Sequence, residues 1–230
     1  MLSEIDASQP QTDSAVRTTD GRGILFVVSA PSGGGKGTLI RRVLNKIVNL
    51  SYSVSFTTRA PRSGEADGRE YFFVTPQKFE EMVAANEFLE WAQVHGKLYG
   101  TGHRQLTREI SEGRDIILEV DVQGAASVRS LVEDAVSIFI LPPSFQILKE
   151  RLVARGTDSA DELELRLRNA PTELEHYSNF QYVIINDDAD RAAEQLASIV
   201  YAERARLSRQ EPRVKRLVEA FATKELSESN

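Results

Sequence analysis

Hydrophobic and polar positions along the chain fall into blocks that predict strands followed by helices. Short apolar runs, typical of buried strands, occupy residues 24–28, 115–120, 136–141 and 182–185. Helical signals follow these runs: apolar spacing after residue 36, a Gly-Ala-Ala stretch, a start signal near Pro143 and Ser144, and a long amphipathic segment after Asn186. This alternation predicts an α/β fold in which helices flank a parallel sheet.

The segment 51–103 departs from this alternation. Strand-like runs at 71–74 and 88–94 surround one helix, which we expect to begin at Thr75 and Pro76. We interpret the segment as a subdomain inserted after the first strand and helix of the core.

Both ends of the chain are polar. Residues 1–20 are rich in Ser, Thr, Asp and Gln, and we expect a disordered N-terminal tail. Residues 211–230 form a polar C-terminal extension that contains an apolar set with the spacing of a short amphipathic helix: Val214, Leu217, Val218 and Phe221. We favour docking of this helix on its own domain over binding of a partner protein.

Composition narrows the class of protein. The chain has 230 residues, of which 41% are hydrophobic and 27% charged, which suits one α/β domain with small inserted subdomains. A net charge of −6 argues against a broad nucleic-acid or anionic-membrane surface, so local arginine clusters would hold anionic substrates. The lack of cysteine excludes disulfides and thiolate zinc sites, and the N-terminus shows no apolar export signal. We therefore expect a cytoplasmic protein.

A glycine-rich loop follows the first predicted strand, where residues 30–38 read Ala-Pro-Ser-Gly-Gly-Gly-Lys-Gly-Thr. Consecutive glycines let backbone N–H groups surround an anion, Lys36 adds a mobile positive charge, and the helix expected there directs its positive dipole end to the same point. The loop departs from the Walker A pattern, because Ala30 replaces a glycine and Gly37 replaces the hydroxyl residue that normally meets Mg²⁺. The order of strand, loop, lysine and helix still predicts a cradle for nucleotide phosphates.

A second and more specific motif lies within the predicted insertion. It comprises Thr57-Thr58-Arg59 followed by Arg62, Glu65, Gly68, Tyr71 and Phe73. At these positions the chain resembles the guanylate kinase family, and the resemblance covers residues 22–210 through these segments: Glu90-Trp91-Ala92, Tyr99-Gly100-Thr101, Asp121-Val122-Gln123-Gly124, Leu141-Pro142-Pro143-Ser144, Arg151 to Gly156, and Asn186-Asp187-Asp188. It implies a P-loop nucleoside monophosphate kinase of purine metabolism, which transfers the γ-phosphoryl group of ATP to GMP or dGMP.

The resemblance also implies how a domain spanning residues 21–210 is divided. The core carries the phosphate loop and comprises residues 21–50, 104–143 and 170–210. A GMP-binding insertion occupies residues 51–103, and a helical lid of about residues 144–169 closes over ATP.

Candidate ATP-binding residues follow from the resemblance: Ala30, Pro31, Ser32, Gly33, Gly34, Gly35, Lys36, Gly37, Thr38 and Asn186. The implied catalytic residues are cations that neutralise charge on the γ-phosphoryl oxygens: Lys36, Arg62, Arg151, Arg155 and Arg166. We expect no protein nucleophile or base, because a phosphate monoester with a second pKa of about 6 is already largely ionised at neutral pH. The histidines show no metal-ligand spacing and receive no role.

The implied GMP-binding residues are these: Ser55, Arg59, Arg62, Tyr71, Glu90, Tyr99, Thr101 and Asp121. Guanidinium groups grip a phosphate dianion through paired charge-assisted hydrogen bonds, and the two phenols add donors. Guanine presents its N1–H and exocyclic amine side by side, so one carboxylate can accept both protons. The resemblance gives this role to Glu90, with Asp121 as the second candidate.

Mg²⁺, bound with ATP, is the expected cofactor. Because Gly37 lacks a hydroxyl, we expect nucleotide phosphates and water to hold the ion, which dehydrates reluctantly. Glu119 and Asp121 are candidates for contact through the water shell, and no direct protein ligand is assigned.

Two alternatives remain open. Guanylate-kinase-like domains of scaffold proteins bind phosphorylated peptides without catalysis, although their phosphate loops and lids tend to be degraded. A kinase for AMP or a pyrimidine monophosphate is the other alternative, against which Glu90 and Asp121 favour guanine. The sequence predicts neither a nucleic-acid nor a membrane partner and leaves the oligomeric state open.

Overall fold

The structure is a computed structural model that describes residues 22–62, 64–94, 96–156 and 159–228. The predicted N-terminal tail and His95 lie outside these residues.

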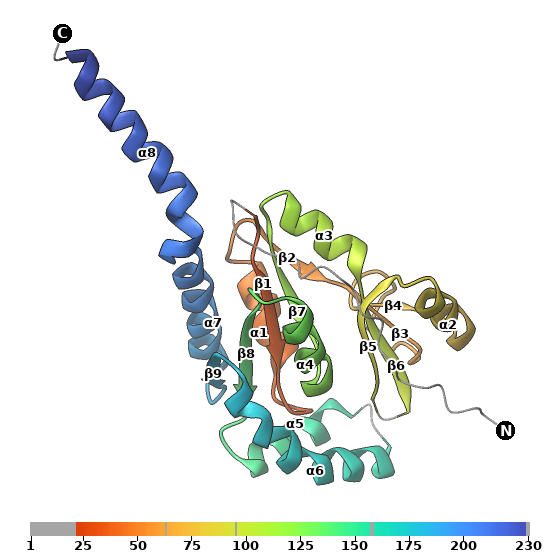
Figure 1. Cartoon of the computed structure of the whole chain (residues 1–230). Coiled ribbons are helices and arrows are strands. Elements are labelled where there is room, and N and C mark those ends of the chain that lie inside the picture. Colours follow the sequence, from red (N-terminus) through yellow and green to blue (C-terminus); the bar gives the residue numbers. More distant parts are fainter. Residues whose placement is uncertain (1–21, 63, 95, 157–158, 229–230) are drawn as a thin grey trace.

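The core is a five-stranded parallel sheet (Figure 1). Its strands lie in the order β2 (Leu50–Ser53), β7 (Asp115–Glu119), β1 (Leu25–Ser29), β8 (Val136–Leu141) and β9 (Tyr182–Ile185), with every neighbouring pair parallel. The four apolar runs that predicted strands correspond to β1, β7, β8 and β9. Strand β1 is buried throughout, as expected of a central strand that is covered on both faces.

Helices cover both faces of this sheet. On one face, Phe26 and Val28 of β1 pack in a cluster with apolar residues of α1 (Lys36–Leu44) and α7 (Ala189–Arg204). On the other, Leu25 and Val27 pack with α3 (His103–Ser111) and α4 (Val122–Leu131). Because successive side chains of a strand point to opposite faces, one apolar run supplies both cores. This confirms the α/β class predicted from the sequence.

A smaller four-stranded sheet lies beside the core. Its order is β4 (Tyr71–Phe73), β3 (Ser55–Thr57), β6 (Lys97–Gly102) and β5 (Phe88–Val94), and α2 (Pro76–Ala84) packs on it through Phe79. The Thr75 hydroxyl caps α2 by accepting the Lys78 N–H, which confirms the helix start predicted there.

The boundary between the two sheets differs from the predicted one. Residues 51–53 were included in the insertion, but they belong to β2, which pairs in parallel with β7 of the core. The smaller sheet begins at Ser55, so only Val54 separates the two sheets at this crossing. The Leu-Ser-Tyr-Ser sequence of β2 lacks the continuous apolar run that identified the other core strands.

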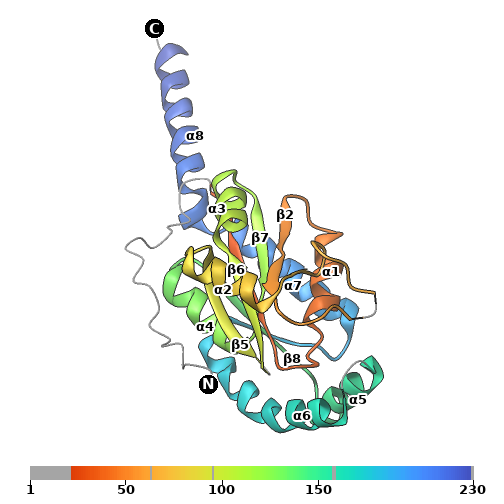
Figure 2. The same ribbon diagram turned by 90° about the vertical axis from the view of Figure 1, so that its right-hand side faces the viewer.

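Two helices, α5 (Phe145–Arg155) and α6 (Ala160–Glu175), lie across one end of the core, and the short 3₁₀ helix η1 (His176–Asn179) follows them (Figure 2). Ser144 caps α5, Gly156 ends it in the left-handed region, and Ser159 begins α6 with a capping box. Leu148 and Leu152 of α5 pack with Ala170 of α6. The cap at Ser144 confirms the helix start predicted near Pro143 and Ser144.

The last helix, α8 (Leu207–Glu228), extends away from the body of the molecule (Figures 1 and 2). The expectation that a short helix here docks on its own domain is wrong, because Leu217 is 50% exposed and Phe221 71% exposed. The described helices include none that is both long enough and apolar enough to cross a membrane. The cytoplasmic location stays a prediction.

Candidate active site

The glycine loop turns the chain from β1 into α1. Gly33 and Gly35 have φ values of 86° and 92°, in the left-handed region that other residues rarely adopt. A Cβ on Gly35 would also lie 2.3 Å from Asn186 Nδ2. The loop delivers the chain into α1 at Lys36, whose Nζ donates to Ala30 O over 3.2 Å, and no side chain caps the helix. A helix N-terminus of this kind binds anions through backbone N–H groups and its dipole.

Asn186 and Arg151 support the loop from behind. Asn186 is buried and donates through Nδ2 to Gly34 O over 2.9 Å, and Arg151 donates through one terminal nitrogen to Asn186 O over 2.8 Å. The other terminal nitrogen, Nη1, is buried without a hydrogen-bond partner and lies 3.7 Å from the point where a Cβ of Gly35 would be. A charged donor without a partner beside an anion-binding loop suits a phosphate oxygen as its acceptor.

Helix α6 contacts the glycine loop at Ser32. Arg166 Nη1 donates to Ser32 Oγ over 2.5 Å, and the Ser32 backbone N–H donates to Glu173 Oε2 over 3.0 Å. Arg166 and Glu173 are seven residues apart and therefore lie on the same helical face. Arg155 ends α5 and is exposed.

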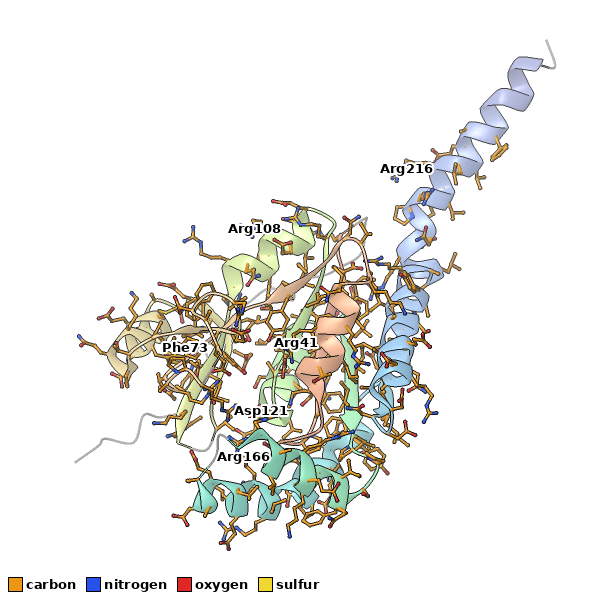
Figure 3. All side chains as sticks on the ribbon, turned by 180° about the vertical axis from the view of Figure 1, so that it is seen from behind. Arg41, Phe73, Arg108, Asp121, Arg166 and Arg216 are labelled. Atoms are coloured by element: carbon orange, nitrogen blue, oxygen red, sulfur yellow. The ribbon has the colours of Figure 1, made fainter. Side chains whose placement is uncertain are left out.

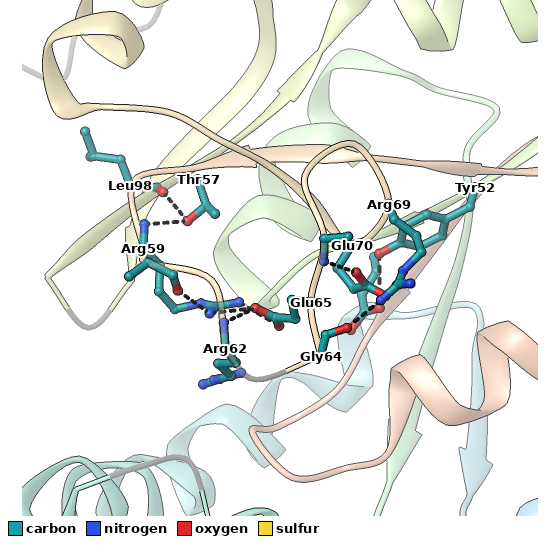
Figure 4. A network of polar contacts seen from close by, with 12 residues as sticks. Tyr52, Thr57, Arg59, Arg62, Gly64, Glu65, Arg69, Glu70 and Leu98 are labelled. Atoms are coloured by element: carbon teal, nitrogen blue, oxygen red, sulfur yellow. Dashed lines mark hydrogen bonds and ion pairs between the residues drawn. The ribbon is translucent and has the colours of Figure 1, made fainter.

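Arg59 and Arg62 are held in one loop by Glu65 (Figure 4). The Arg59 guanidinium makes two parallel hydrogen bonds of 2.9 Å to the Glu65 carboxylate, which also accepts the Arg62 backbone N–H over 2.7 Å. Burial raises the pKa of Glu65, but the hydrogen bonds from Arg59 and Arg62 outweigh it and the net shift is downward. The Arg62 side chain points away from Glu65 (Figure 4).

Two phenols line the same part of the smaller sheet. The Tyr71 and Tyr99 rings meet edge to face with centroids 5.9 Å apart, and the Arg59 guanidinium lies 5.4 Å from the centre of the Tyr71 ring. Burial raises the pKa of Tyr71, and the nearby negative charge of Glu119 raises it further. Tyr71 is therefore a neutral hydrogen-bond donor at physiological pH.

Glu90 forms a buried polar pair with Thr101. Glu90 on β5 is 8% exposed, and its Oε1 accepts a 2.5 Å hydrogen bond from the fully buried Thr101 hydroxyl on β6. Burial raises the pKa of Glu90 to about 7 against the lowering effect of that hydrogen bond, and the charge of Asp121 raises it as well. Ser55, also buried, lies on β3, the other neighbour of β6.

Glu119 and Asp121 lie where β7 ends beside the glycine loop. Asp121 caps α4 by accepting the Gly124 N–H over 2.7 Å, and Glu119 Oε2 lies 3.7 Å from the Cβ position of Gly37. Tyr52 on β2 donates its hydroxyl to Glu119 over 3.4 Å. In the described part of the chain, no cluster of three or more His, Cys, Asp or Glu side chains could hold a metal ion.

Comparison with known proteins gives the family. The family model for guanylate kinase matches residues 22–203. The chain belongs to the guanylate kinase family. It is 49% identical to a guanylate kinase of Dechloromonas aromatica over 180 residues, covering 78% of this chain and 89% of that one. A guanylate kinase of Nitrosomonas europaea is 46% identical over 198 residues, covering 86% and 98% of the two chains.

A solved guanylate kinase structure agrees with this fold. The crystal structure of the enzyme from Anaplasma phagocytophilum superposes with a TM-score of 0.70 at 32% identity, and the match covers 84% of this chain and 92% of that one. The parallel core with helices on both faces is therefore that of a guanylate kinase.

Within this guanylate kinase fold, the predicted residues gather in two groups. The first surrounds the glycine loop and contains residues 30–38, Asn186, Arg151 and Arg166. The second lies on the smaller sheet and contains Ser55, Arg59, Tyr71, Glu90, Tyr99 and Thr101. Asp121 lies between the two groups. It follows the core strand β7, and its charge raises the pKa of Glu90 on the smaller sheet.

Helix α6 of this guanylate kinase lies near the loop of the smaller subdomain that carries Arg62. Hydrogen bonds within the Ser159 cap lower the pKa of Glu162, and the charges of Arg166 and Arg62 add to that shift. Arg62 of the insertion therefore lies within electrostatic reach of α6. Arg166 reaches the end of the core where Asp121 also lies (Figure 3).

Sequence reasoning missed two supporting residues of this guanylate kinase: Glu173 accepts the loop N–H of Ser32, and Tyr52 donates to Glu119. Glu65 was noted within the motif, but its role in holding Arg59 was not predicted. The seven-residue spacing of Arg166 and Glu173 was a signal for the first. No local signal marked Tyr52, because its partner is 67 residues away.

Proposed function

We propose that this chain transfers the γ-phosphoryl group of ATP to GMP, giving ADP and GDP. The observation that carries the proposal is the buried Glu90–Thr101 pair on the smaller sheet, where Glu90 lies within electrostatic reach of Asp121 of the core. A buried carboxylate with one free oxygen suits the two adjacent donors of guanine. The relatives named guanylate kinase support the same activity.

The glycine loop would hold the ATP phosphates. Backbone N–H groups at the start of α1, the Lys36 ammonium and the unpartnered nitrogen of Arg151 all provide positive charge at this point. Arg166 reaches the same loop through Ser32 and would move onto the γ-phosphate with Arg155 when the lid closes. Asn186 supports the loop backbone.

The smaller sheet would hold GMP. Arg59, Arg62, Tyr71 and Tyr99 would bind its phosphate, since the guanidinium groups pair with phosphate oxygens and the phenols donate. The base would donate to Glu90, with Asp121, Ser55 and Thr101 binding the remaining polar edge. No assigned residue is needed at the ribose 2′-hydroxyl, and the proposal therefore extends to dGMP.

The reaction then needs alignment and charge neutralisation. An oxygen of the GMP phosphate attacks the γ-phosphorus, a new P–O bond forms, and the bond from that phosphorus to the β–γ bridging oxygen breaks to release ADP. No protein base is required, because the GMP phosphate has a second pKa of about 6 and is mostly dianionic at neutral pH. Lys36 and the lid arginines neutralise the charge on the transferred group.

Mg²⁺ fits the acidic end of β7. The Glu119 carboxylate faces Gly37, where a loop hydroxyl would otherwise stand, and Asp121 follows two residues later. These carboxylates would hold the ion through water, as suits a cation that keeps most of its hydration shell. Bound Mg²⁺ neutralises phosphate charge and orients the ATP phosphates.

The features of the loop and lid favour an enzyme over a phosphopeptide-binding module. A module needs neither an ATP loop nor lid cations, yet Arg151 and Arg166 are both directed at the glycine loop. A kinase for AMP would place the adenine N1 lone pair against Glu90, leaving two acceptors face to face.

A coupled assay of ADP formation with ATP, Mg²⁺ and a panel of monophosphates tests the proposal. We expect turnover with GMP and dGMP, and a loss on the order of 10² in kcat for Lys36→Met. Lys46→Met is the matched control, because the exposed Lys46 makes only a surface ion pair with Glu194. Turnover of AMP or a pyrimidine monophosphate equal to that of GMP, or no ADP formation with any acceptor, would overturn it.

A further inference from the structure

The root of α8 is fixed to the domain by a buried carboxylate. Glu203, at the end of α7, is 1% exposed and accepts a 2.6 Å hydrogen bond from the Tyr182 hydroxyl of β9. Arg206 and Arg209 pair with the same carboxylate over 3.3 Å and 3.8 Å. Arg209 also donates to Asp134 O over 3.2 Å. This network explains why α8 leaves the body in a defined direction instead of folding back on it (Figures 1 and 2).

One face of α8 carries an uncovered apolar stripe. Its members are between 41% and 74% exposed: Leu207, Val214, Leu217, Val218 and Phe221. At 3.6 residues per turn, this set covers a sector of about 100°. Leu207, Val214 and Phe221 recur every seven residues, and Leu217 follows Val214 by three, which is the spacing of a coiled-coil seam. Such a seam is completed by a second helix.

The charges along α8 favour a second copy of the same helix as that partner. In the sequence, residues 207–216 contain four basic residues and one acidic residue, a net charge of +3. Residues 217–226, the equal length that follows, contain two acidic residues and one basic residue, a net charge of −1. Two copies in antiparallel order place each basic half along an acidic half, whereas a parallel pair places like charges together.

We propose that α8 pairs with α8 of a second copy of this chain, antiparallel, around a two-fold axis near residue 216. An interface of this kind uses the same surface on both copies and closes after two, so the product is a dimer. The helix has 22 residues and is about 33 Å long at 1.5 Å per residue, so each tip reaches the root of the other copy. The lid lies at the opposite end of the molecule, and the nucleotide sites stay accessible in the dimer (Figure 1).

Sedimentation velocity on the full chain tests the association. We expect the native chain to sediment as a dimer, and Leu217→Glu to weaken dimerisation by on the order of 100-fold, because it places a charge in the apolar seam. Ala220→Glu is the matched control, since it adds the same charge within one turn but outside the stripe, and it should leave the dimer intact. Both variants should keep the native kinase rate.

Spin-label distances test the orientation, and the absence of native cysteine makes single-cysteine variants unambiguous. In the antiparallel dimer, labels on Arg216→Cys lie at the same height, while labels on Ser208→Cys are separated by about 24 Å along the axis. Equal short distances at both positions would contradict the antiparallel order. A monomeric native chain, or equal loss of dimer in Leu217→Glu and Ala220→Glu, would overturn the proposal.

Discussion

Glu90 and Thr101 face each other across β5 and β6, and the Thr101 hydroxyl donates to Glu90 Oε1 over 2.5 Å in a site where both residues are buried. The hydrogen bond fixes one carboxylate oxygen, and burial raises the pKa of the group to about 7. Glu90 is therefore a hydrogen-bond acceptor whose ionisation depends on whether a ligand occupies the site.

GMP binding should depend on pH through Glu90. The two guanine donors need the ionised carboxylate, but below pH 7 burial keeps Glu90 protonated. GMP binding must then remove this proton, so the affinity for GMP should fall by up to about tenfold per pH unit. The GMP phosphate, with a second pKa of about 6, titrates in every variant. Calorimetry on native protein and Glu90→Gln between about pH 6 and 8 isolates the carboxyl contribution. Identical pH dependence in both would contradict this assignment.

The same shift predicts an effect on stability of the ligand-free chain. Because the pKa is raised from 4.5 to about 7, the folded chain holds this proton more tightly than the unfolded chain does. Glu90 therefore costs stability increasingly as pH rises through that range. Thermal unfolding measures this effect. Between acidic and neutral pH, the free energy of unfolding of Glu90→Gln should rise by about 1–3 kcal/mol relative to that of the native chain.

Much of the fold was predictable because buried central strands are continuous apolar runs. The strands β1 and β8 stand out in the sequence for this reason, and the capping residues Thr75 and Ser144 marked helix starts. The strand β2 was not predictable in this way, because its Leu-Ser-Tyr-Ser sequence lacks a continuous apolar run. Amphipathic spacing in α8 indicated an interface but not its partner.

The candidate site was also predictable only in part. The residues proposed to touch substrate lie in motifs, whereas the supporting residues Glu173 and Tyr52 contact their partners over long sequence separations. Glu173 is 141 residues from Ser32, so single-sequence patterns could not pair them. Hydrophobic periodicity could not predict that Glu90 is buried either, and only the family resemblance indicated its role.

Glu65→Gln should weaken GMP binding without changing the affinity for ATP. Glu65 orients the Arg59 guanidinium and the Arg62 amide, and the neutral side chain loses one of the two charge-assisted bonds to Arg59. We expect KM for GMP to rise about 10-fold. Glu70→Gln is the matched control, because Glu70 lies in the same loop but pairs with the exposed Arg69. An equal effect of both variants would refute the role of Glu65.

Arg151→Ala should lower kcat by on the order of 10² to 10³, since it removes a donor aimed at the phosphate loop as well as the bond to Asn186. Lys149→Ala, on an exposed position of the same helix, should behave as native. Steady-state kinetics with GMP varied at saturating ATP separates this effect from GMP binding. Retention of native kcat in Arg151→Ala would exclude the proposed contact.

ATP and GMP together should draw the lid and the smaller sheet over the core. Closure excludes water that would otherwise hydrolyse ATP, and Gly156, in the left-handed region between α5 and α6, provides a turn at which the lid can move. Small-angle scattering should show a smaller radius of gyration with a bisubstrate mimic than with either nucleotide alone. An unchanged radius with the mimic would count against closure.

The most direct test of guanine recognition is the ratio of kcat/KM for GMP, IMP and AMP in the native chain and in Glu90→Gln. A site built on hydrogen bonds to both guanine donors should prefer GMP over AMP by about 10⁴-fold, with IMP between them because it keeps N1–H but lacks the amine. Glu90→Gln should reduce the GMP to AMP ratio by at least about 10²-fold, since an amide cannot accept both protons. An AMP rate that rivals GMP in the native chain, or an unchanged ratio in Glu90→Gln, would contradict the account.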